Sequence, residues 1–397
     1  MVVLLLLSGN IHSRTIWVSL YNSRQVRSVV VSAYNGQLTV LADGREQFTI
    51  AFGHAIYANL HDGKIWISDQ YGQIGAFDRL IIQGADSSAV VRLRPVSPQA
   101  EARNYEEAVS LTADVDRIQL INRIDEERYL AGVVEAESGQ GKTPEFYKAI
   151  AIICRTYLYG HIDRHENERF HLCDEVHCQA YKGQCRSRDM ILPAIQATRN
   201  IILTDRKESK PILAAYHSNC GGETESAQNA WQNNLPYLTP IIDSYCTSSP
   251  NARWQKIISL EDWINYLMKN GFKPNPNTVT DFNFLQNSRI PFYKVNQFTL
   301  PVRNIRNDWQ LRSTFFSISV ADGNVVFHGR GYGHGVGLCQ EGAMEMGRRG
   351  FKYDEIISFY YKQVNLSSVD MLHIRIPEFD EEPHPQPLSI GEGGVRN

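Results

Sequence analysis

Apolar and polar residues alternate along the first part of the chain, between Thr15 and about Gly84. This period of two is typical of strands with one buried face, as at Val29 and Val31. Dipeptides that favour tight turns interrupt the alternation at Asn35-Gly36, Asp43-Gly44, Asp62-Gly63 and Tyr71-Gly72. The pattern predicts a β-rich N-terminal region of short strands joined by tight turns.

A mixed pattern of strands and helices follows. The polar stretch from Pro95 to Glu106 predicts a domain boundary, and residues 115–122 predict a strand. From Asp125 to about Glu137 the apolar residues recur with the period of an amphipathic helix. Glu137 is therefore expected at a helix end.

A second helix is expected from Thr143-Pro144-Glu145 to about His161. A capping threonine, a proline in the first turn and an acid at the positive end of the helix dipole all favour a helix start. Further elements are expected at residues 201–204 and 212–217 (strands), 260–270 (a helix after the cap-like Ser259), 315–328 (a hairpin around Asp322-Gly323) and 340–347 (a helix).

These patterns predict an α+β fold. We expect a β-rich N-terminal region at residues 1–95, a main domain at 96–376 and a disordered tail at 377–397, where prolines, acids and glycines accumulate. Within residues 1–10 an apolar run from Val2 to Leu7 is too short to span a bilayer, and we interpret it as the remnant of a signal peptide. Later apolar stretches are all broken by charge or glycine, so no transmembrane segment is predicted.

Composition narrows the class of function. With 397 residues, 43% of them hydrophobic, the chain can bury a large core. A formal net charge of -3 provides no basic field for nucleic acid, which argues against a nucleic-acid binder. The many tyrosines and phenylalanines suit sugar rings, but they suit the core of a β-rich protein equally well.

The seven cysteines cannot all pair with one another, and three of them crowd between Cys173 and Cys185. Two imidazoles and two thiols lie close together in sequence at His171, Cys173, His177 and Cys178. Zinc favours such tetrahedral nitrogen and sulfur sets, and four protein ligands would make the ion structural. The first ligand is alternatively His165, and Cys185 can replace one thiolate. The competing hypotheses are a disulfide from Cys173 to Cys178 or Cys185, or free thiols.

Four segments combine glycines with polar and titratable residues. They are Tyr129-Leu130-Ala131-Gly132-Val133-Val134-Glu135-Ala136-Glu137, the stretch Lys148 to Tyr157 with Arg155-Thr156-Tyr157, the stretch Ala215 to Thr224 with His217-Ser218-Asn219-Cys220-Gly221-Gly222, and Gly329 to Ala343 with Gly333-His334-Gly335-Val336-Gly337-Leu338-Cys339-Gln340.

In these four blocks, which occur in order, the chain resembles the stage II sporulation protein D (SpoIID) family. The resemblance implies a SpoIID-like catalytic core with lytic transglycosylase activity. Such an enzyme cuts the bond between N-acetylmuramic acid and N-acetylglucosamine in peptidoglycan glycan strands, preferably strands stripped of their stem peptides. The family pattern continues with Met-Pro after its catalytic glutamate, whereas this chain has Ser138-Gly139.

The resemblance assigns the catalytic role to Glu137. Glu135 is the second candidate, because the spacing from Gly132-Val133-Val134 selects Glu137. One carboxyl suffices for this chemistry: it protonates the glycosidic oxygen and then takes the proton from the sugar's 6-hydroxyl, which closes a 1,6-anhydro ring. A hydrolase instead needs two carboxylates across the bond. To begin protonated, Glu137 needs a pKa raised from about 4.3 by apolar surroundings.

The resemblance also implies a substrate groove. Tyr216, His217, Ser218 and Gln340 would bind sugar hydroxyl and acetamido groups, and Arg155 would brace the site from its helix. His334 lies between glycines that permit close approach to a ligand, although a structural histidine in a tight loop has the same pattern. We expect His334 and Tyr216 to Ser218 to meet Glu137 across one groove. Some family members hold zinc with a His-Cys-His-Cys set near the active site, which supports zinc here.

Two other functions are compatible with the sequence. The resemblance allows a module that grips glycan without cutting it and activates a partner cell-wall amidase. A purely structural envelope protein is disfavoured, because cores have no need of polar His and Gln residues between glycines. Under each of these hypotheses the expected location is periplasmic or extracellular, in association with the cell envelope.

Overall fold

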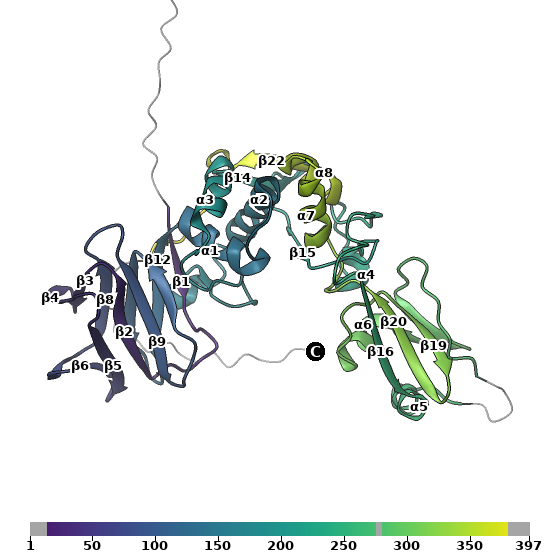
Figure 1. Ribbon diagram of the computed structural model, residues 1–397, viewed down its shortest axis with the longest axis horizontal. Coiled ribbons are helices and arrows are strands. Elements are labelled where there is room, and N and C mark those ends of the chain that lie inside the picture. Colours follow the sequence, from purple (N-terminus) through teal and green to yellow (C-terminus); the bar gives the residue numbers. More distant parts are fainter. Residues whose placement is uncertain (1–13, 275–279, 380–397) are drawn as a thin grey trace, which may run out of the picture. The chain divides into compact units, whose positions relative to one another are not determined.

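The structure is a computed structural model that describes residues 14–274 and 280–379. The chain forms two compact units (Figure 1). Of the described residues, unit 1 comprises 14–140, 161–199 and 373–379, and unit 2 comprises 141–160, 200–274 and 280–372. The signal-peptide remnant expected at residues 1–10 lies outside the described residues, as does the tail from residue 380 onwards.

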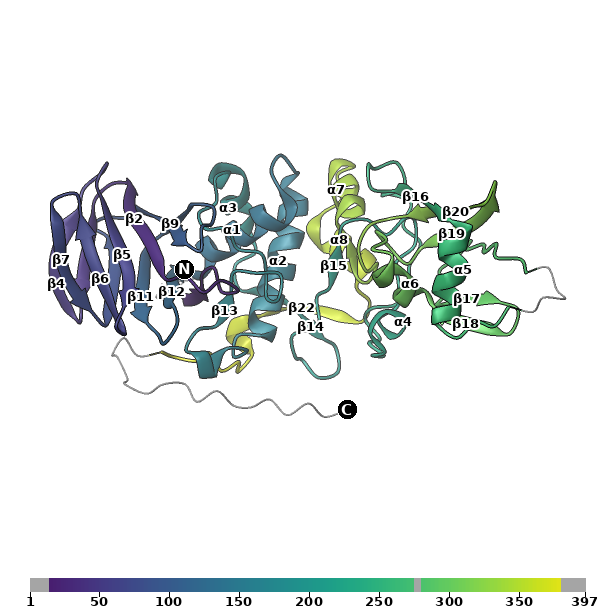
Figure 2. The same cartoon turned by 90° about the horizontal axis from the view of Figure 1, so that it is seen from below.

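Two sheets form the N-terminal part of unit 1 (Figure 2). All of their strand pairs are antiparallel except β1 with β13. The first sheet has the order β13 (Leu172–Cys173), β1 (Thr15–Ser19), β12 (Ile118–Asp125), β11 (Ala108–Ala113), β8 (Arg79–Gly84), β3 (Leu38–Ala42) and β4 (Arg45–Ile50). The second has the order β10 (Arg103–Glu106), β9 (Val90–Ser97), β2 (Ser28–Asn35), β5 (Ala55–His61), β6 (Lys64–Asp69) and β7 (Gly72–Phe77).

Alternate apolar side chains of both sheets are buried. Val29 and Val31 of β2 and Leu38 and Val40 of β3 are all 0% exposed. Residues of β8 contact β9, and residues of β11 contact β6, so the two buried faces share one core. The alternation in sequence therefore predicts the burial correctly, because successive residues of a strand point to opposite faces.

The predicted turns have two different outcomes. Asp43-Gly44, Asp62-Gly63 and Tyr71-Gly72 each join neighbouring antiparallel strands, as a hairpin turn does. Asn35-Gly36 instead lies between β2 and β3, which belong to different sheets. Dipeptide chemistry indicates a turn but does not indicate which strands pair on either side of it.

The boundary predicted at residue 95 falls inside a strand. Pro95 belongs to β9 and lies opposite Val29 of β2, and the sheets continue through β12 to Asp125. The first residues of the predicted tail make ordered contacts: the carbonyl of the buried Pro377 bonds to His171, and the ring of Phe379 lies 5.5 Å from that of Trp17.

The described part of unit 1 also contains the α-helices α1 (Glu126–Ser138) and α3 (Arg188–Ala197), which pack against each other, and a 3-10 helix at Glu166–Glu168. Asp125 caps α1: its side chain accepts N–H bonds from Glu127 and Arg128 at 2.9 and 3.1 Å. The helix predicted from Asp125 onwards is confirmed, because an acid at the N-cap satisfies amides that have no partner within the helix.

In unit 2, three helices pack together: α2 (Pro144–Gly160), α7 (Gln340–Arg348) and α8 (Tyr353–Tyr360). Beside α2, β14 (Ile201–Asp205) pairs with β22 (Val364–Ser368). A short parallel pair joins β15 (Tyr216–His217) to β21 (Leu338–Cys339). The helix predicted from Pro144 is confirmed, whereas the strand predicted at 212–217 is reduced to its last two residues.

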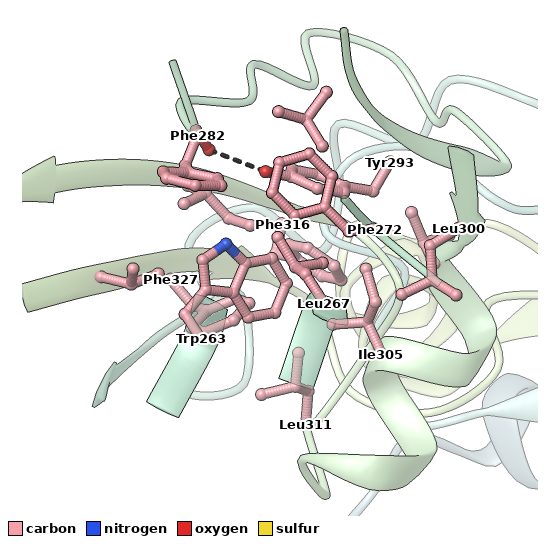
Figure 3. Close-up of a cluster of buried hydrophobic side chains, with 14 residues drawn as sticks. Trp263, Leu267, Phe272, Phe282, Tyr293, Leu300, Ile305, Leu311, Phe316 and Phe327 are labelled. Carbon is pink, nitrogen blue, oxygen red and sulfur yellow. Dashed lines mark hydrogen bonds between the residues drawn. The ribbon is translucent and has the colours of Figure 1, made fainter. Parts of the chain in front are cut away.

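The remainder of unit 2 surrounds a second hydrophobic core (Figure 3). Trp263, fully buried, lies at its centre and packs edge-on against the rings of Tyr293 and Phe327. The elements that contribute to it are β16 (Arg253–Ser259), α5 (Leu260–Lys269), β17 (Phe292–Val295), β18 (Phe298–Pro301), α6 (Val302–Asp308), β19 (Phe316–Ala321) and β20 (Asn324–Arg330). The short helix α4 (Ala227–Trp231) also belongs to unit 2. The predicted α5, capped by Ser259, and the predicted hairpin of β19 and β20 are both confirmed.

The architecture is α+β, with a β-rich N-terminal part, as predicted. Across residues 14–274 and 280–379, every helix is too short or too polar to cross a bilayer.

Candidate functional site

Glu137 lies in the last turn of α1, one residue before the helix ends at Ser138. Its Oε1 accepts an N–H bond from Ala180 at 2.9 Å. Gly139 then leaves the helix with φ 70° and ψ -169°, a conformation that favours glycine. The chain therefore leaves α1 through a glycine, and the carboxyl of Glu137 is held against the loop that contains Ala180.

Glu135 has a different environment. Its carboxylate accepts N–H bonds from Arg186 and Ser187, both at 2.8 Å, at the start of α3. Burial raises the pKa of Glu135, but these amides outweigh burial and hold the pKa below its ordinary value. Glu135 therefore joins two helices as a carboxylate, which is a structural role.

The loop that contains Ala180 also packs on the middle of α1. A Cβ at Gly132 would lie 2.7 Å from a ring carbon of Tyr181, so a larger residue would displace the loop. The Tyr181 hydroxyl donates to Asn122 at 2.8 Å. Together, Gly132, Glu135 and Glu137 hold residues 179–187 against one helix.

Four side chains from the residues that precede this loop in sequence could hold a metal ion. They are His165, Cys173, His177 and Cys178, and one ligand atom from each lies within 4.8 Å of all the others. Cys178 Sγ is 3.5 Å from His165 Nε2 and 3.7 Å from His177 Nδ1. Cys178 precedes Ala180, the partner of Glu137, by two residues, so the cluster and the glutamate share one short segment.

The structure places His165, and not His171, beside the other three ligands. His171 Nδ1 accepts the N–H of Trp17, and its Nε2 lies 2.9 Å from the carbonyl of Pro377. Both ring nitrogens of His171 are thus used elsewhere, and the alternative His165 takes its place. Cys185 lies outside the group, and burial raises the pKa of its thiol to about 12.

The donor set fits zinc. Two imidazoles and two thiols are a common ligand set for tetrahedral zinc. The second ring nitrogen of His165 lies 2.6 Å from the carboxylate of Glu168, which is the outer contact that orients a ligating histidine. With four protein ligands such an ion would be structural, and the loop it would hold is the one that contacts Glu137.

We expect Glu135→Gln to lower the free energy of unfolding by about 1.5 to 3 kcal/mol, the range for hydrogen bonds to a charged group. The effect should be full above about pH 4.3 and should shrink at lower pH, because the wild-type carboxylate, whose pKa is depressed, is then protonated. Urea denaturation at pH 7 and pH 3 measures it. An unchanged midpoint at pH 7 would contradict the structural role.

In unit 2, the glycine-rich block 331–337 packs closely on residues 215–221. A Cβ at Gly333 would lie 2.9 Å from the Cβ of His217, and one at Gly337 would clash with the carbonyl of Ala215. A Cβ at Gly335 would lie 2.7 Å from the guanidinium of Arg289. These glycines permit close approach of protein to protein; the prediction from sequence was close approach to a ligand.

His217 and His334 lie next to each other, with ring centroids 5.5 Å apart. His217 is buried, 4% exposed, and its Nδ1 lies 3.1 Å from the carbonyl of Val336. His334 accepts the N–H of Val336 at 3.0 Å. Burial lowers the pKa of His334 to about 4 and that of His217 well below its ordinary value, so both imidazoles are neutral at neutral pH.

His334 also lines a pocket of about 650 Å³. Trp231 lies on the same wall, with its ring centroid 5.0 Å from that of His334. The lining combines an aromatic ring, amides and cations, which is a surface suited to a polar ligand with flat faces. It includes Glu225, Asn229, Trp231, Arg303, Arg306 and His334. Apart from His334, no sequence motif singled out these residues.

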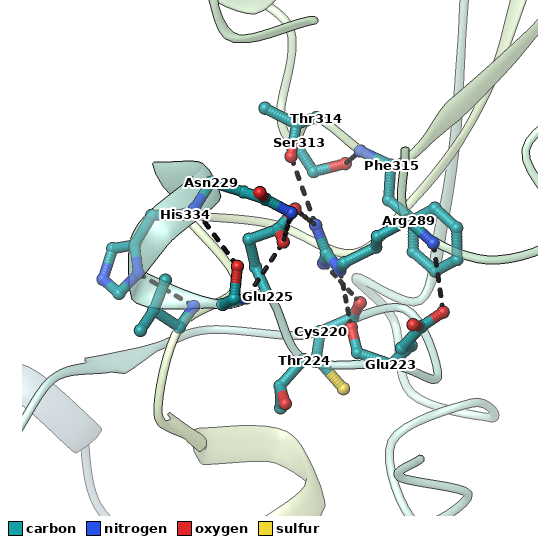
Figure 4. A network of polar contacts seen from close by, with 12 residues as sticks. Cys220, Glu223, Thr224, Glu225, Asn229, Arg289, Ser313, Thr314, Phe315 and His334 are labelled. Carbon is teal, nitrogen blue, oxygen red and sulfur yellow. Dashed lines mark hydrogen bonds and ion pairs between the residues drawn. The ribbon is translucent and has the colours of Figure 1, made fainter. Parts of the chain in front are cut away.

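A buried arginine organises the wall behind this pocket (Figure 4). Arg289 donates to the carbonyls of Glu223 and Cys220 at 2.7 and 2.8 Å. It also lies 3.7 Å from Oε2 of Glu225, and Oε1 of the same carboxylate accepts an N–H bond from the Asn229 side chain at 3.0 Å. Arg289 thereby fixes the backbone that follows His217.

The other predicted groove residues have mixed positions. Tyr216, Ser218 and Gln340 are partly exposed, whereas Arg155 is 0% exposed in α2, a position that suits bracing and not contact with a ligand. Glu137 belongs to unit 1 and His334 to unit 2. That these residues share a single groove stays a prediction.

Residues 114–204 match the family described as SpoIID, Stage II sporulation protein. This range includes Glu137 and all four members of the His/Cys cluster. The Stage II sporulation protein D of Bacillus subtilis is 27% identical over 297 residues, which cover 70% of this chain and 85% of that protein. An uncharacterised protein of Brachyspira hyodysenteriae is 29% identical over 259 residues, 63% of this chain and 69% of that protein.

A more distant relative has a different name. The Amidase enhancer of Bacillus subtilis is 24% identical over 295 residues, which cover 60% of this chain and 40% of that protein.

Proposed function

Because the chain belongs to the stage II sporulation protein D family, we propose that it is a lytic transglycosylase of peptidoglycan glycan strands. Family membership supports a role at the cell wall. Its substrates would be strands without stem peptides, cut between N-acetylmuramic acid and N-acetylglucosamine to leave 1,6-anhydro ends. The proposed cleavage of glycan strands would take place outside the cytoplasmic membrane.

The observation that carries this proposal is the environment of Glu137. The carboxyl lies at a helix end, is half-buried and is oriented by the amide of Ala180. Glu135, two residues earlier, is committed to the amides of α3. Of these two glutamates, Glu137 is therefore the one suited to exchange a proton with a ligand.

In the proposed reaction Glu137 acts twice. Its carboxyl protonates the glycosidic oxygen as the bond to the anomeric carbon of N-acetylmuramic acid breaks. The resulting carboxylate then takes the proton of the same sugar's 6-hydroxyl, whose oxygen bonds to the anomeric carbon. The amide of Ala180 would fix the orientation of the carboxyl throughout.

The pocket beside His334 would bind part of the strand. Trp231 offers a ring face for a sugar, and Arg303 and Arg306 offer donors for acetamido and lactyl oxygens. His217 would support His334 from behind, since it is buried. Zinc bound by His165, Cys173, His177 and Cys178 would stabilise the loop that orients Glu137 and would take no part in proton transfer.

Incubation of the purified chain with glycan strands from which an amidase has removed the stem peptides tests this proposal. Strand shortening, followed by size-exclusion chromatography, is the expected result, with slower shortening of intact peptidoglycan. Binding of denuded strands without any shortening would contradict the enzymatic proposal.

The resemblance to an amidase enhancer favours a second candidate function, activation of a cell-wall amidase by a glycan-bound partner. The two functions differ in what the chain does by itself. An activator would leave strands intact and raise the rate at which an added amidase releases stem peptides. A Glu137→Gln variant would keep that effect, whereas it would lose transglycosylase activity.

We expect His334→Ala to lower kcat/KM for denuded strands about tenfold, the equivalent of one hydrogen bond of about 1.4 kcal/mol, with a smaller change in unfolding free energy. Because burial lowers the pKa of His334 to about 4, the ring stays neutral and the loss should be the same from pH 6 to pH 8. His328→Ala, at an exposed histidine of β20, is the matched control. If His334→Ala lowers the free energy of unfolding by more than it raises the activation free energy calculated from kcat/KM, the role of His334 is purely structural.

A further inference from the structure

A second group of potential metal ligands lies in unit 2, and the proposed reaction makes no use of it. It consists of Cys220, Asp243, Cys246 and Cys339, one ligand atom of each lying within 4.8 Å of all the others. All four residues are buried. They come from three separate parts of the chain, and two of them belong to the blocks that contain His217 and Gln340.

The spacing of these atoms suits a tetrahedral ion better than a disulfide. The sulfurs of Cys220 and Cys246 are 3.3 Å apart, whereas a disulfide bond is about 2.04 Å long. Three thiolates on one zinc ion, each about 2.3 Å from the metal, would lie about 3.8 Å from one another. The carboxylate of Asp243, 3.3 Å from the Cys220 sulfur, completes the fourth corner.

Backbone amides point at one of the sulfurs. Cys339 Sγ accepts N–H bonds from Cys220 at 3.3 Å and Gly342 at 3.4 Å. Such donors favour sulfur in its anionic, metal-binding form.

Asp243 is held by its own outer contacts. Its Oδ2 accepts the hydroxyl of Tyr360 at 2.9 Å, and its Oδ1 accepts the N–H of Tyr245 at 2.9 Å. Contacts of this kind orient the ligands of a metal site. Three thiolates and one carboxylate carry more negative charge than a single Zn²⁺ cancels, and the buried guanidinium of Arg289, bonded to the Cys220 carbonyl at 2.8 Å, offsets part of the remainder.

We propose that Cys220, Asp243, Cys246 and Cys339 bind a zinc ion. Binding would release the thiol protons to solvent, and four protein ligands would leave no position for a reactive water. This ion would tie the strand pair β15 and β21 to the start of α7, and so hold the block of His217 against that of Gln340. The site is independent of the proposed reaction.

Zinc content of the full chain, purified with reductant and without chelator, tests this site. Equilibration with zinc and removal of the excess should leave two ions per chain, one in each cluster. Asp243→Asn and Cys246→Ser should leave one ion, as should Cys178→Ser in the other cluster. Cys154→Ala, at a buried cysteine of unit 2 outside both groups, should keep two.

Cobalt gives a second readout for variants that fold poorly. Co²⁺ added to Cys178→Ser protein should produce sulfur-to-cobalt charge-transfer absorption, and Asp243→Asn added to that variant should weaken cobalt binding about tenfold or more. Full zinc content in Cys246→Ser would overturn the proposal. So would a Cys220–Cys246 disulfide in peptide maps of unreduced protein, or Cys178→Ser protein that binds neither metal.

Discussion

Replacement of Glu137 by glutamine is expected to lower the rate of glycan cleavage by about 10²- to 10⁴-fold, the usual contribution of a general acid and base. The amide keeps the shape of the side chain, and its oxygen can still accept the N–H of Ala180. Folding and strand binding should therefore change little. Initial rates on denuded strands, measured beside melting temperature and strand affinity, separate these effects.

Glu135→Gln is the matched control, because it makes the same chemical change two residues away on the same helix. Its expected signature is the opposite one: lower stability through the lost charge at Arg186 and Ser187, with turnover within a few-fold of wild type. An inactive but folded Glu135→Gln, together with an active Glu137→Gln, would reverse the assignment.

Loss of the zinc ion proposed at His165, Cys173, His177 and Cys178 should have the second largest effect. The binding free energy of a structural ion is also folding free energy, and zinc at about 1,000 times its Kd contributes about 4 kcal/mol. At roughly 2 to 4 °C per kcal/mol for a domain of this size, Cys178→Ser should melt roughly 8 to 16 °C lower. Calorimetry with and without added zinc measures the shift.

Cys185→Ala provides the control in the same loop, since Cys185 is buried there but lies outside the ligand group. It should keep the wild-type zinc content, and added zinc should restore its melting temperature after chelation. Wild-type zinc content in Cys178→Ser would show that His165, Cys173, His177 and Cys178 do not bind the ion. Loss of turnover with no change in stability would instead indicate that the ion serves the chemistry directly.

Local signals in the sequence predict the elements near the site. Asp125 caps α1, and Pro144 begins α2, because the hydrogen bonds and backbone preferences that start a helix involve neighbouring residues. The strand alternation likewise predicts which faces are buried. At Asn35-Gly36 the chain passes from one sheet to the other, and β9 continues through Pro95. Both features depend on partner strands that are distant in sequence, so the spacing of residues does not predict them.

The candidate metal ligands show the same limit. The sequence predicts His171 as the first ligand with His165 as the alternative, and the contacts that engage His171 elsewhere come from Trp17 and Pro377, which lie far along the chain from it. The second cluster joins Cys220 to Cys339, and the pairing of β15 with β21 brings their segments together. The glycines of the block 331–337 were predicted to serve a ligand, and their contacts with His217 and Arg289 show a packing role.

Mass spectrometry of the glycan ends tests the central claim most directly. Denuded strands of defined length, incubated with the purified chain, should yield fragments that end in 1,6-anhydro-N-acetylmuramic acid and are one water lighter than hydrolysis products, and Glu137→Gln protein should yield none. Fragments with reducing ends would indicate a hydrolase with a second carboxylate. Intact strands after incubation with folded, zinc-loaded protein would contradict the account.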